Sequence, residues 1–379
     1  MYKGYKIRLY PTKEQEELMW KHIHTCRFIW NYMLELQEKR YHNGEKHLSV
    51  FSLMKELTIL KQNPDYLWLY EVSNHSLQDV CKDLEFAYQS FYKKTNGLPK
   101  FKSKRKTKNW SYPTRSDRLV FKDGYVKLEV IKNVKAKITF VPQGKIYNPR
   151  ISFVNNKWIL SFAVECENQA VETTDIPMGI DLGIKEFAVV SFGDEKLVFH
   201  NINYSKRVRT LQHKLKHIQR ARDRKMRTNG NFEKTKGIQK YERIEKQLNC
   251  KLKNIRRNYI HYVTHELVKL LPNKITIENL DVMSMMKNKH VAKYVELQGF
   301  CIFAKVLRYK CENNNIEFQR ADRWFPSSKM CSNCGNIKKK MYLADRVYKC
   351  SKCGFTIDRD YNAAINLMRY VPPTERCTA

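Results

Sequence analysis

Apolar residues from Leu77 to Phe91 recur at intervals of three or four positions, the spacing of one face of an α-helix. This pattern predicts a helix from residue 74 onwards, and two earlier helices are expected over about residues 13–38 and 49–61. A capping-box pattern at Thr12 favours a helix start directly after it. We interpret the apolar stripe of the third helix as bundle core, so residues 12–95 are expected to form a helical subdomain.

Residues 118–166 alternate between apolar and polar positions, which predicts β-strands. One hairpin is expected around the turn at Asp123-Gly124, and a second within residues 151–164. These strands should form a small antiparallel barrel or sandwich. The strand predicted at residues 3–10 could complete it.

A new domain is expected from Met178 onwards, with short apolar strands and long helices. The last helix follows Asp360 and ends near Pro372. Strands are expected at about residues 178–183, 187–191, 274–280 and 316–319, and helices at about 205–223, 234–270 and 298–312.

Two Cys-x-x-Cys pairs near the end of the chain are separated by fifteen residues. Such pairs indicate a tetrahedral zinc site, because each pair supplies two thiolates from one tight turn. A glycine directly after each pair supports this interpretation over four unrelated cysteines. Four protein ligands leave no open position, so the zinc should be structural. The expected ligands are Cys331, Cys334, Cys350 and Cys353.

The chain of 379 residues carries a net charge of +33, from 71 Lys and Arg against 38 acidic residues. At 42% hydrophobic residues it can still bury a core, so it is not a disordered basic protein. The charge indicates a polyanionic partner, most plausibly nucleic acid. A membrane partner lacks support, because no apolar run approaches the ~18 residues of a membrane span.

Two basic segments are candidate nucleic-acid surfaces. Residues 97–112 interleave lysines with aromatic residues, which can neutralise phosphates and stack on unpaired bases. Residues 206–257 hold 19 Lys and Arg against four acids, too large an excess for salt bridges along a helix. The alternatives are a solvated linker and a solvated helix face. The candidate contacts are Lys100, Lys102, Lys104, Arg105, Trp110, Lys206, Arg207, Arg209, Arg220, Arg224, Arg256 and Arg257.

Three acids interrupt apolar surroundings: Asp181 inside a strand, Glu278 at the end of another, and Asp360 at a helix start. A carboxylate in such a place costs free energy unless it is paired or holds a metal. Three of them together would favour Mg²⁺ or Mn²⁺, which prefer hard oxygen ligands. On the residues alone, alternatives remain: Asp358 and Asp360 could be helix caps, and Glu278 a surface residue.

Several segments resemble the signature segments of TnpB, a transposon-encoded family of RNA-guided nucleases related to type V CRISPR effectors. The similarity spans nearly the whole chain, in the family's order. The segments are Gly179-Ile-Asp-Leu-Gly-Ile-Lys185, Ile277-Glu-Asn-Leu280, Phe325-Pro-Ser-Ser-Lys-Met-Cys-Ser-Asn-Cys-Gly335 and Asp358-Arg-Asp-Tyr-Asn-Ala-Ala364, with Tyr5-Lys-Ile-Arg-Leu-Tyr-Pro11 and Leu98-Pro-Lys-Phe-Lys-Ser-Lys-Arg105 in support.

The resemblance implies a multidomain α/β plus β-barrel protein. Its nuclease domain would be RuvC-like, with an RNase H fold and an inserted zinc ribbon. A wedge β-barrel carrying a helical recognition lobe would precede it. The implied boundaries are residues 1–10 and 98–174 for the wedge, 11–97 for the lobe, 175–325 and 357–372 for the nuclease domain, 326–356 for the ribbon and 373–379 for a tail.

The resemblance also implies that Asp181, Glu278 and Asp360 are the metal-binding catalytic acids. Asp360 is chosen over Asp358 because the family's acid lies two residues before the Asn that is Asn362 here. The implied function is a metal-dependent, RNA-guided DNA endonuclease of a transposon, using Mg²⁺ or Mn²⁺ for hydrolysis and Zn²⁺ for structure.

Its implied partners are a guide RNA from the transposon end and double-stranded target DNA with a flanking motif. Asn74 and Gln78 are candidates to read that motif, since amide groups suit adenine edges. They could equally be a cap and a surface residue. We expect a cytoplasmic, nucleoid-associated bacterial protein. The alternatives are a non-cleaving RNA-guided repressor and an unguided zinc-ribbon nucleic-acid-binding accessory of transposition.

Overall fold

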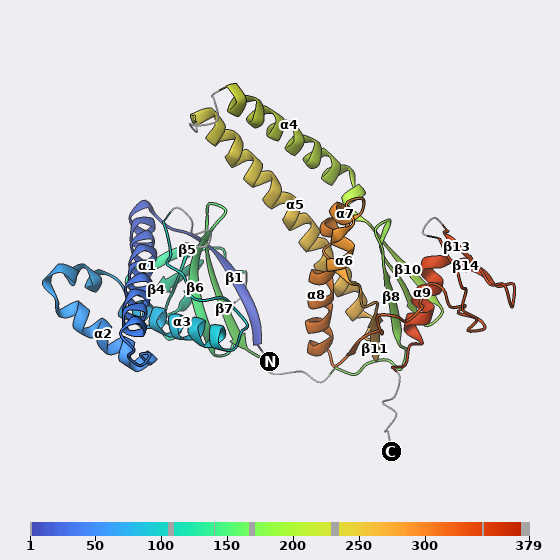
Figure 1. Ribbon diagram of the computed structural model, residues 1–379, viewed down its shortest axis with the longest axis horizontal. Coiled ribbons are helices and arrows are strands. Elements are labelled where there is room, and N and C mark those ends of the chain that lie inside the picture. Colours follow the sequence, from blue (N-terminus) through green and yellow to red (C-terminus); the bar gives the residue numbers. More distant parts are fainter. Residues whose placement is uncertain are drawn as a thin grey trace, which may run out of the picture. The chain divides into compact units, whose positions relative to one another are not determined.

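The computed structural model describes residues 2–104, 110–139, 141–166, 171–228, 235–342 and 345–372 (Figure 1). The chain divides into two units, Met1–Glu167 and Asn168–Ala379, and each is described by itself. The predicted change from wedge to nuclease domain, at residues 174–175, falls close to this division. The predicted tail lies outside the described residues.

The first unit is built on a seven-stranded antiparallel sheet with the N-terminal strand in its middle. Strand β1 (Tyr2–Tyr10) pairs with β7 (Lys157–Glu165) on one side and β5 (Lys132–Ala136) on the other. The predicted N-terminal strand therefore does join this sheet. Among the described residues the pairings give an open order, so a closed barrel stays a prediction. The other strands are β2 (Trp110–Pro113), β3 (Val120–Lys122), β4 (Tyr125–Leu128) and β6 (Ile146–Val154).

Both predicted hairpins of this sheet are confirmed. The turn between β3 and β4 places Asp123 and Gly124 at φ 49° and 78°, and the turn between β6 and β7 places Asn155 and Asn156 at 52° and 58°. Two consecutive positive φ angles characterise the two-residue turn that matches strand twist, and Asn, Asp and Gly adopt them at least cost. Strand β5 was not predicted, because lysines and an asparagine occupy most of its positions.

The predicted helices of the first unit are confirmed, with α1 starting directly after the Thr12 capping box. They do not form a separate bundle core, however. Their apolar faces join those of the sheet in one cluster, and the Ser76 hydroxyl donates a 2.6 Å hydrogen bond to the carbonyl of Pro113 in β2. The elements are α1 (Lys13–His42), α2 (Val50–Gln62), the 3-10 segment η1 (Pro64–Glu71) and α3 (Asn74–Tyr92).

The second unit contains a five-stranded mixed sheet in the order β10-β9-β8-β11-β12. The first three strands along the chain are antiparallel neighbours, and the last two run parallel to β8. The predicted strands are confirmed, while β10 was not foreseen. The strands are β8 (Met178–Leu182), β9 (Glu186–Phe192), β10 (Glu195–His200), β11 (Lys274–Ile277) and β12 (Glu317–Arg320).

Helices cover both faces of this sheet. Alternate residues of β8, Met178 and Ile180, share a core with α5 and α8 on one face, whereas Gly179 between them meets α9 on the other. Helices α4 and α5 form a long hairpin (Figure 1). The helices are α4 (Lys206–Thr228), α5 (Lys236–Lys269), α6 (Val282–Lys287), α7 (Ala292–Gln298), α8 (Phe300–Asn313) and α9 (Arg359–Met368), with η2 (Ile202–Tyr204) before α4.

Candidate active site and metal centre

The parallel pairing of β8 with β11 brings Asp181 and Glu278 together. Ile277 is aligned with Ile180 in this ladder, so the next residues, Asp181 and Glu278, are neighbours on adjacent strands. Because side chains alternate along a strand, both point to the sheet face opposite the core that contains Ile180 and Ile277. Two acids that are 97 positions apart in the sequence therefore lie beside each other on one face of the sheet.

Helix α9 lies directly on this face and brings the third acid. A Cβ atom added to Gly179 would come within 2.0 Å of the Ala364 carbonyl oxygen and 2.2 Å of the Met368 nitrogen. Only glycine allows so close an approach of helix to strand. The first turn of α9 contains Asp360, and its charge acts on Asp181.

The helix cap is a different aspartate. The Asp358 side chain accepts a 2.9 Å hydrogen bond from the backbone N–H of Tyr361, as an N-cap residue does. Asp358 is therefore the N-cap of α9, and the side chain of Asp360 is not needed for that role. Asp358 is exposed and lies 3.5 Å from the Lys196 ammonium, whereas Asp360 is partly buried.

The electrostatics of the cluster show that it is poorly compensated by the protein. Burial, followed by repulsion from Glu278 and Asp360, raises the pKa of Asp181 well above its ordinary value. Burial also raises the pKa of Glu278, opposed by hydrogen bonds from Ser327 and Asp181 and by the charge of Arg359. The Arg359 guanidinium is held 3.1 Å from the carbonyl oxygen of Tyr342. The charge of Arg359 lowers the pKa of both Asp181 and Glu278 but does not outweigh the effect of burial.

Ser327 is a site residue that the search for acids missed. Its hydroxyl donates a 2.6 Å hydrogen bond to Glu278 Oε1. Its own carbonyl accepts a 2.7 Å bond from Asn366 of α9, which also bonds the carbonyl of Met330. One turn earlier, Asn362 donates to the same Met330 carbonyl at 2.7 Å. Helix α9 thus fixes the segment that orients Glu278. The sequence did contain a signal, because Ser327 lies in the Phe325–Gly335 segment that resembles the TnpB family. A search for acidic residues alone does not consider the serines of that segment.

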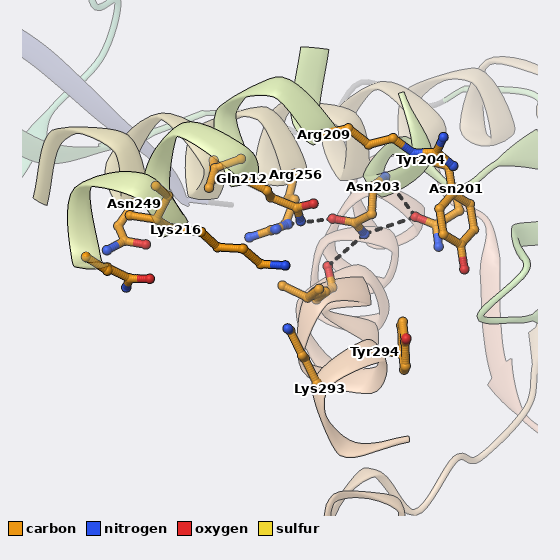
Figure 2. Close-up of a pocket in the computed structure, with 14 residues that line it drawn as sticks. Asn201, Asn203, Tyr204, Arg209, Gln212, Lys216, Asn249, Arg256, Lys293 and Tyr294 are labelled. Atoms are coloured by element: carbon orange, nitrogen blue, oxygen red, sulfur yellow. Dashed lines mark hydrogen bonds between the residues drawn. The ribbon is translucent and has the colours of Figure 1, made fainter. Parts of the chain in front are cut away.

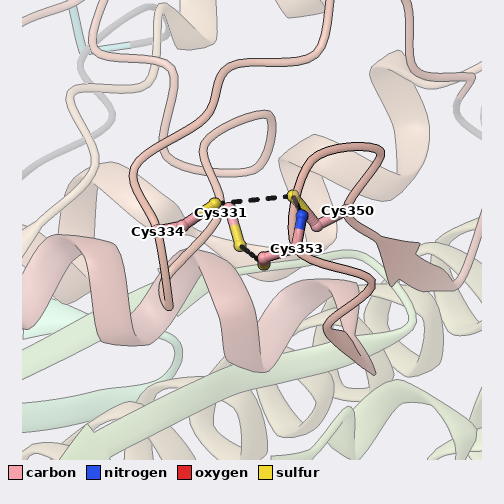
Figure 3. Close-up of side chains that lie close together, drawn as sticks. All are labelled: Cys331, Cys334, Cys350 and Cys353. Carbon is pink, nitrogen blue, oxygen red and sulfur yellow. Dashed lines mark hydrogen bonds between the residues drawn. The ribbon is translucent and has the colours of Figure 1, made fainter.

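The four predicted cysteines meet in one cluster. Their sulfur atoms all lie within 4.8 Å of one another, with Cys331 and Cys353 3.7 Å apart and Cys334 and Cys350 3.6 Å apart. A tetrahedral zinc with Zn–S bonds of about 2.3 Å requires S···S separations of roughly 3.8 Å. Figure 3 shows the two pairs on facing loops. The cluster is zinc-ribbon-like and able to hold a metal.

Backbone N–H groups support the thiolate form of Cys350. The N–H groups of Lys352 and Cys353 point to Cys350 Sγ at 3.4 and 3.5 Å. The hydrogen bond from Cys353 leads the contributions that lower the pKa of Cys350 to about 6. Strands β13 (Val347–Lys349) and β14 (Thr356–Asp358) flank the second pair, and β14 runs directly into α9. The cluster thereby anchors the start of the helix that carries Asp360.

The ligand atoms of the three acids are more widely spaced than the sulfur atoms of the four cysteines. In the described part of the chain, only the four cysteines form a group of three or more such ligands within 4.8 Å. The oxygens of Asp181, Glu278 and Asp360 are therefore not all within that distance. Carboxylates spaced more widely, in a site short of positive charge, suit hard cations that also keep waters and substrate oxygens as ligands. The donor set fits Mg²⁺ or Mn²⁺ rather than zinc.

The candidate contacts in the first basic segment differ in exposure. Lys100 and Lys104 are exposed. The Lys102 ammonium lies 3.4 Å from the ring centroid of Trp30, and burial lowers the pKa of Lys102 to about 8. Packing accounts for Lys102 without a phosphate. Arg105 and the side chain of Trp110 lie outside the described residues.

The candidates for reading a flanking motif lie at the start of α3. The helix cap is Ser73, not Asn74. The Asn74 side-chain oxygen accepts a 2.6 Å bond from Lys61, which leaves its amide N–H groups for another partner. Gln78 is half-buried on the same helix. Both remain candidates.

Most candidates on the α4–α5 hairpin are exposed. Arg256 differs, because it is half-buried and its Nε donates a 2.7 Å hydrogen bond to Asn203 Oδ1. In the described part of the chain no helix is long and apolar enough to cross a membrane. The candidate contacts of the α4–α5 hairpin that are exposed are Lys206, Arg207, Arg209, Arg220, Arg224 and Arg257.

The mixed sheet, the clustered acids and the four-thiolate group define an α/β protein with two candidate metal sites. Three family sequence models match the chain: "Helix-turn-helix domain" at residues 1–46, "Probable transposase" at 161–289 and "Cas12f1-like, TNB domain" at 300–367. The last two of these matches support the resemblance of the chain to the TnpB family.

Curated relatives match along nearly the whole chain. A Streptomyces pristinaespiralis protein named "Putative RNA-guided DNA endonuclease" is 27% identical, over 97% of this chain and 88% of the relative. The TnpB-like protein L770 of Acanthamoeba polyphaga mimivirus is 26% identical, over 96% of this chain and 72% of the relative. The solved structure of the mini-RNA-guided endonuclease CRISPR-Cas phi3 shares the fold, with a TM-score of 0.52 at 11% identity, over 97% and 92% of the two chains.

One family description differs from the structure. Residues 1–46 match a model described as helix-turn-helix. Here they form one strand, β1, and the single 30-residue helix α1. The apolar face of that helix packs into the core shared with the sheet, so this segment of the chain does not present a two-helix DNA-reading motif.

Proposed function

We propose that this protein is an RNA-guided DNA endonuclease that hydrolyses target DNA at the site formed by Asp181, Glu278 and Asp360. The observation that carries the proposal is the convergence of these three acids, from two strands and a helix, into a partly buried cluster with too little positive charge. Such a cluster costs stability unless it serves to bind cations.

Each acid has a distinct part in the proposed site. Asp181 and Glu278 hold the cations from adjacent strand positions, and Asp360 closes the site from the start of α9. Ser327 donates a hydrogen bond to Glu278 Oε1 and so orients this carboxylate. When bound, Mg²⁺ or Mn²⁺ would supply a water activated for attack and would stabilise the leaving oxygen.

The fold supports a nuclease assignment for the second unit. We propose that its three antiparallel and two parallel strands form an RNase H-type, RuvC-like domain over residues 175–325 and 357–372. The cysteine cluster of residues 326–356 is proposed to bind a structural zinc. The wedge and recognition-lobe assignments of the first unit rest on the family resemblance.

The partners are proposed from the relatives and the charge. Relatives carry names that describe RNA-guided DNA endonucleases, and the net charge of +33 suits a chain that binds both RNA and DNA. In such a protein base pairing of the guide reads sequence, while the protein reads shape and a short flanking motif. The guide is proposed to derive from the transposon end.

The test starts from the RNA bound to the purified protein. Sequencing that RNA defines the guide, and a plasmid library carrying the matched target with random flanks supplies the substrate. Wild-type protein with Mg²⁺ should cut the matched plasmid and should stop cutting with EDTA. Asp181→Ala should lose cleavage at least about a thousandfold while retaining RNA and guided DNA binding. Cleavage by this variant at the wild-type rate would refute the site.

The same assay separates the alternatives. A non-cleaving repressor would bind matched DNA without cutting it under any metal condition, and Asp181→Ala would change nothing. An unguided accessory protein would purify without a defined RNA species and would bind matched and unmatched DNA alike.

A further inference from the structure

A cationic pocket lies at the base of the α4–α5 hairpin, within the second unit (Figure 2). Its volume is about 480 Å³, inside the range of roughly 300–1,000 Å³ in which proteins bind small ligands or single nucleotides. Its walls come from the segment before α4, from α4 and α5, and from α7. The residues that the argument uses are Asn203, Tyr204, Arg209, Lys216, Arg256, Lys293 and Tyr294.

The cations of this pocket have no acidic partners. None of the described residues lining it is a carboxylate. Among the described residues, no salt bridge involves Arg209, Lys216, Arg256 or Lys293, although the chain forms many elsewhere. Glu296 acts on Arg256 electrostatically but does not line the pocket. Four cations that form no salt bridge with any described residue surround one hollow and favour an anion there.

The floor of the pocket is rigid and polar. Asn203 is nearly fully buried; its Oδ1 accepts a 2.7 Å bond from Arg256, and its Nδ2 donates a 2.9 Å bond to Asn201 Oδ1. Asn201 in turn donates to the carbonyl of Ile184, in the turn that follows β8. The Arg256 guanidinium is thus fixed in place before any ligand binds, which reduces the entropic cost of binding.

Two exposed aromatic rings stand at the pocket. Tyr204 and Tyr294 are 45% and 49% exposed, so part of each ring is accessible to a ligand. The Arg209 guanidinium carbon lies 5.6 Å from the Tyr204 ring centroid. Figure 2 shows Lys216 of α4 and Lys293 of α7 pointing toward the same space, with Tyr294 to one side of them. Aromatic rings beside cations are the combination that binds unpaired nucleotides, by stacking on the base and pairing with the phosphate.

We propose that this pocket binds one unpaired nucleotide of a single strand, with its phosphate on the lysines and arginines and its base against Tyr294 or Tyr204. The inference rests on the proposed function for the nature of its ligand. The strand is either guide RNA or an opened DNA strand; both present the same phosphate and base.

Photo-cross-linking of the RNA-free full-length protein tests the pocket. The probes are ten-nucleotide oligomers of RNA or DNA with one central 5-iodouridine or 5-iododeoxyuridine, and mass spectrometry locates the adduct. We expect adducts on Tyr294 or Tyr204, and the arm that gives more of them identifies the strand. Adducts found only outside the pocket would overturn the proposal.

Binding measurements test the roles of charge and ring. Lys216→Ala with Lys293→Ala should weaken binding about tenfold or more and flatten the salt dependence, because two phosphate contacts are lost. Tyr294→Ala should weaken binding about tenfold, Tyr294→Phe should restore it, and an abasic central unit should remove the difference between them. These three side chains are exposed, so their truncation leaves the core intact.

The matched control is Lys246→Ala with Lys253→Ala, which removes the same charge from exposed positions of α5 outside the pocket. Equal losses for the two double variants would mean a general cationic surface and no pocket. If guided cleavage occurs but the pocket variants bind like the control, this inference fails alone. If the pocket variants lose binding but no guided cleavage occurs, the proposed function fails alone.

Discussion

The hydroxyl of Ser327 donates a 2.6 Å hydrogen bond to Oε1 of Glu278. The two residues lie 49 positions apart, and Asn366 of α9 holds the Ser327 carbonyl in place. The segment directly after β11, which contains Glu278, is therefore joined at one point to the loop before the cysteines and to the last helix. Loss of this bond would free the Glu278 carboxylate to rotate.

Ser327→Ala should lower the rate of guided DNA cleavage about tenfold without abolishing it, because Glu278 keeps its position but loses its orientation. RNA binding and the melting temperature should change little. Ser328→Ala is the matched control and should cleave like wild type. Equal rates for both variants would show that the hydrogen bond does not serve the site.

Substitution of Asp358 should affect mainly stability, whereas substitution of Asp360 should affect mainly cleavage. Asp358→Ala removes the α9 cap and should cost about 1 kcal/mol of stability while cleavage survives. Asp360→Asn keeps the shape of the side chain and should abolish cleavage with little change in melting temperature. Thermal unfolding and a cleavage time course check both. The reverse pattern would assign the catalytic role to Asp358.

Gly179→Ala should damage the second unit through packing alone. The added Cβ would lie 2.0 Å from the Ala364 carbonyl oxygen, so α9 would have to move away from β8. Overpacking of this kind typically costs about 1–3 kcal/mol, and here it would also displace Asp360. Gly4→Ala is the control, since a Cβ there meets nothing within 4 Å. A Gly179→Ala protein with wild-type stability and cleavage would contradict this packing.

Removal of the proposed zinc should destabilise the end of the chain. Wild-type protein should carry one zinc per chain by elemental analysis, and Cys331→Ser or Cys350→Ser should carry none. Both variants should become sensitive to proteolysis between about residues 326 and 358 and lose cleavage, because β14 leads into α9. Cys301→Ser, at an exposed cysteine outside the cluster, is the control. A metal-free wild-type protein with full activity would refute the zinc assignment.

Lys102 should make stability depend on pH. Burial lowers the pKa of Lys102 to about 8 in the folded protein, whereas an unfolded lysine titrates near about 10.4. Between these values the unfolded chain binds more protons, so this residue should make stability rise as pH increases from about 8 to 10. Lys102→Met should remove that rise, and at pH 7 it should stabilise the protein by about 1–3 kcal/mol.

Exposed Lys100 is the control, since Lys100→Met should leave the pH profile unchanged. The measurement is denaturant unfolding at several pH values for wild type and both variants. A Lys102→Met profile parallel to that of wild type would show that the ammonium is solvated.

Helices and strands of this protein could be predicted from the sequence where their apolar residues follow one clear pattern. Helix α3 was predictable because its apolar residues repeat at one spacing, and the start of α1 because Thr12 and Gln15 form a capping box. The strands at Asp181 and before Glu278 were predictable because they are short apolar runs. Strands β5 and β10 were not, since at least half of the residues in each are polar, most are exposed, and both strands are held by pairing with neighbouring strands. The short helices α6 and α7 leave too few residues for a period to show.

The cysteine spacing and the excess of basic residues by themselves determined a thiolate cluster and a cationic protein, because both are properties of the chain's composition and local order. Tertiary structure alone decided that Asp181 and Glu278 are neighbours, since this depends on the register of two strands separated by a long helical hairpin. It also decided that Asp360 faces the site while Asp358 caps the helix, because the approach of α9 to Gly179 fixes the helix orientation. A sequence specifies which groups are available; only packing brings distant ones to the same point.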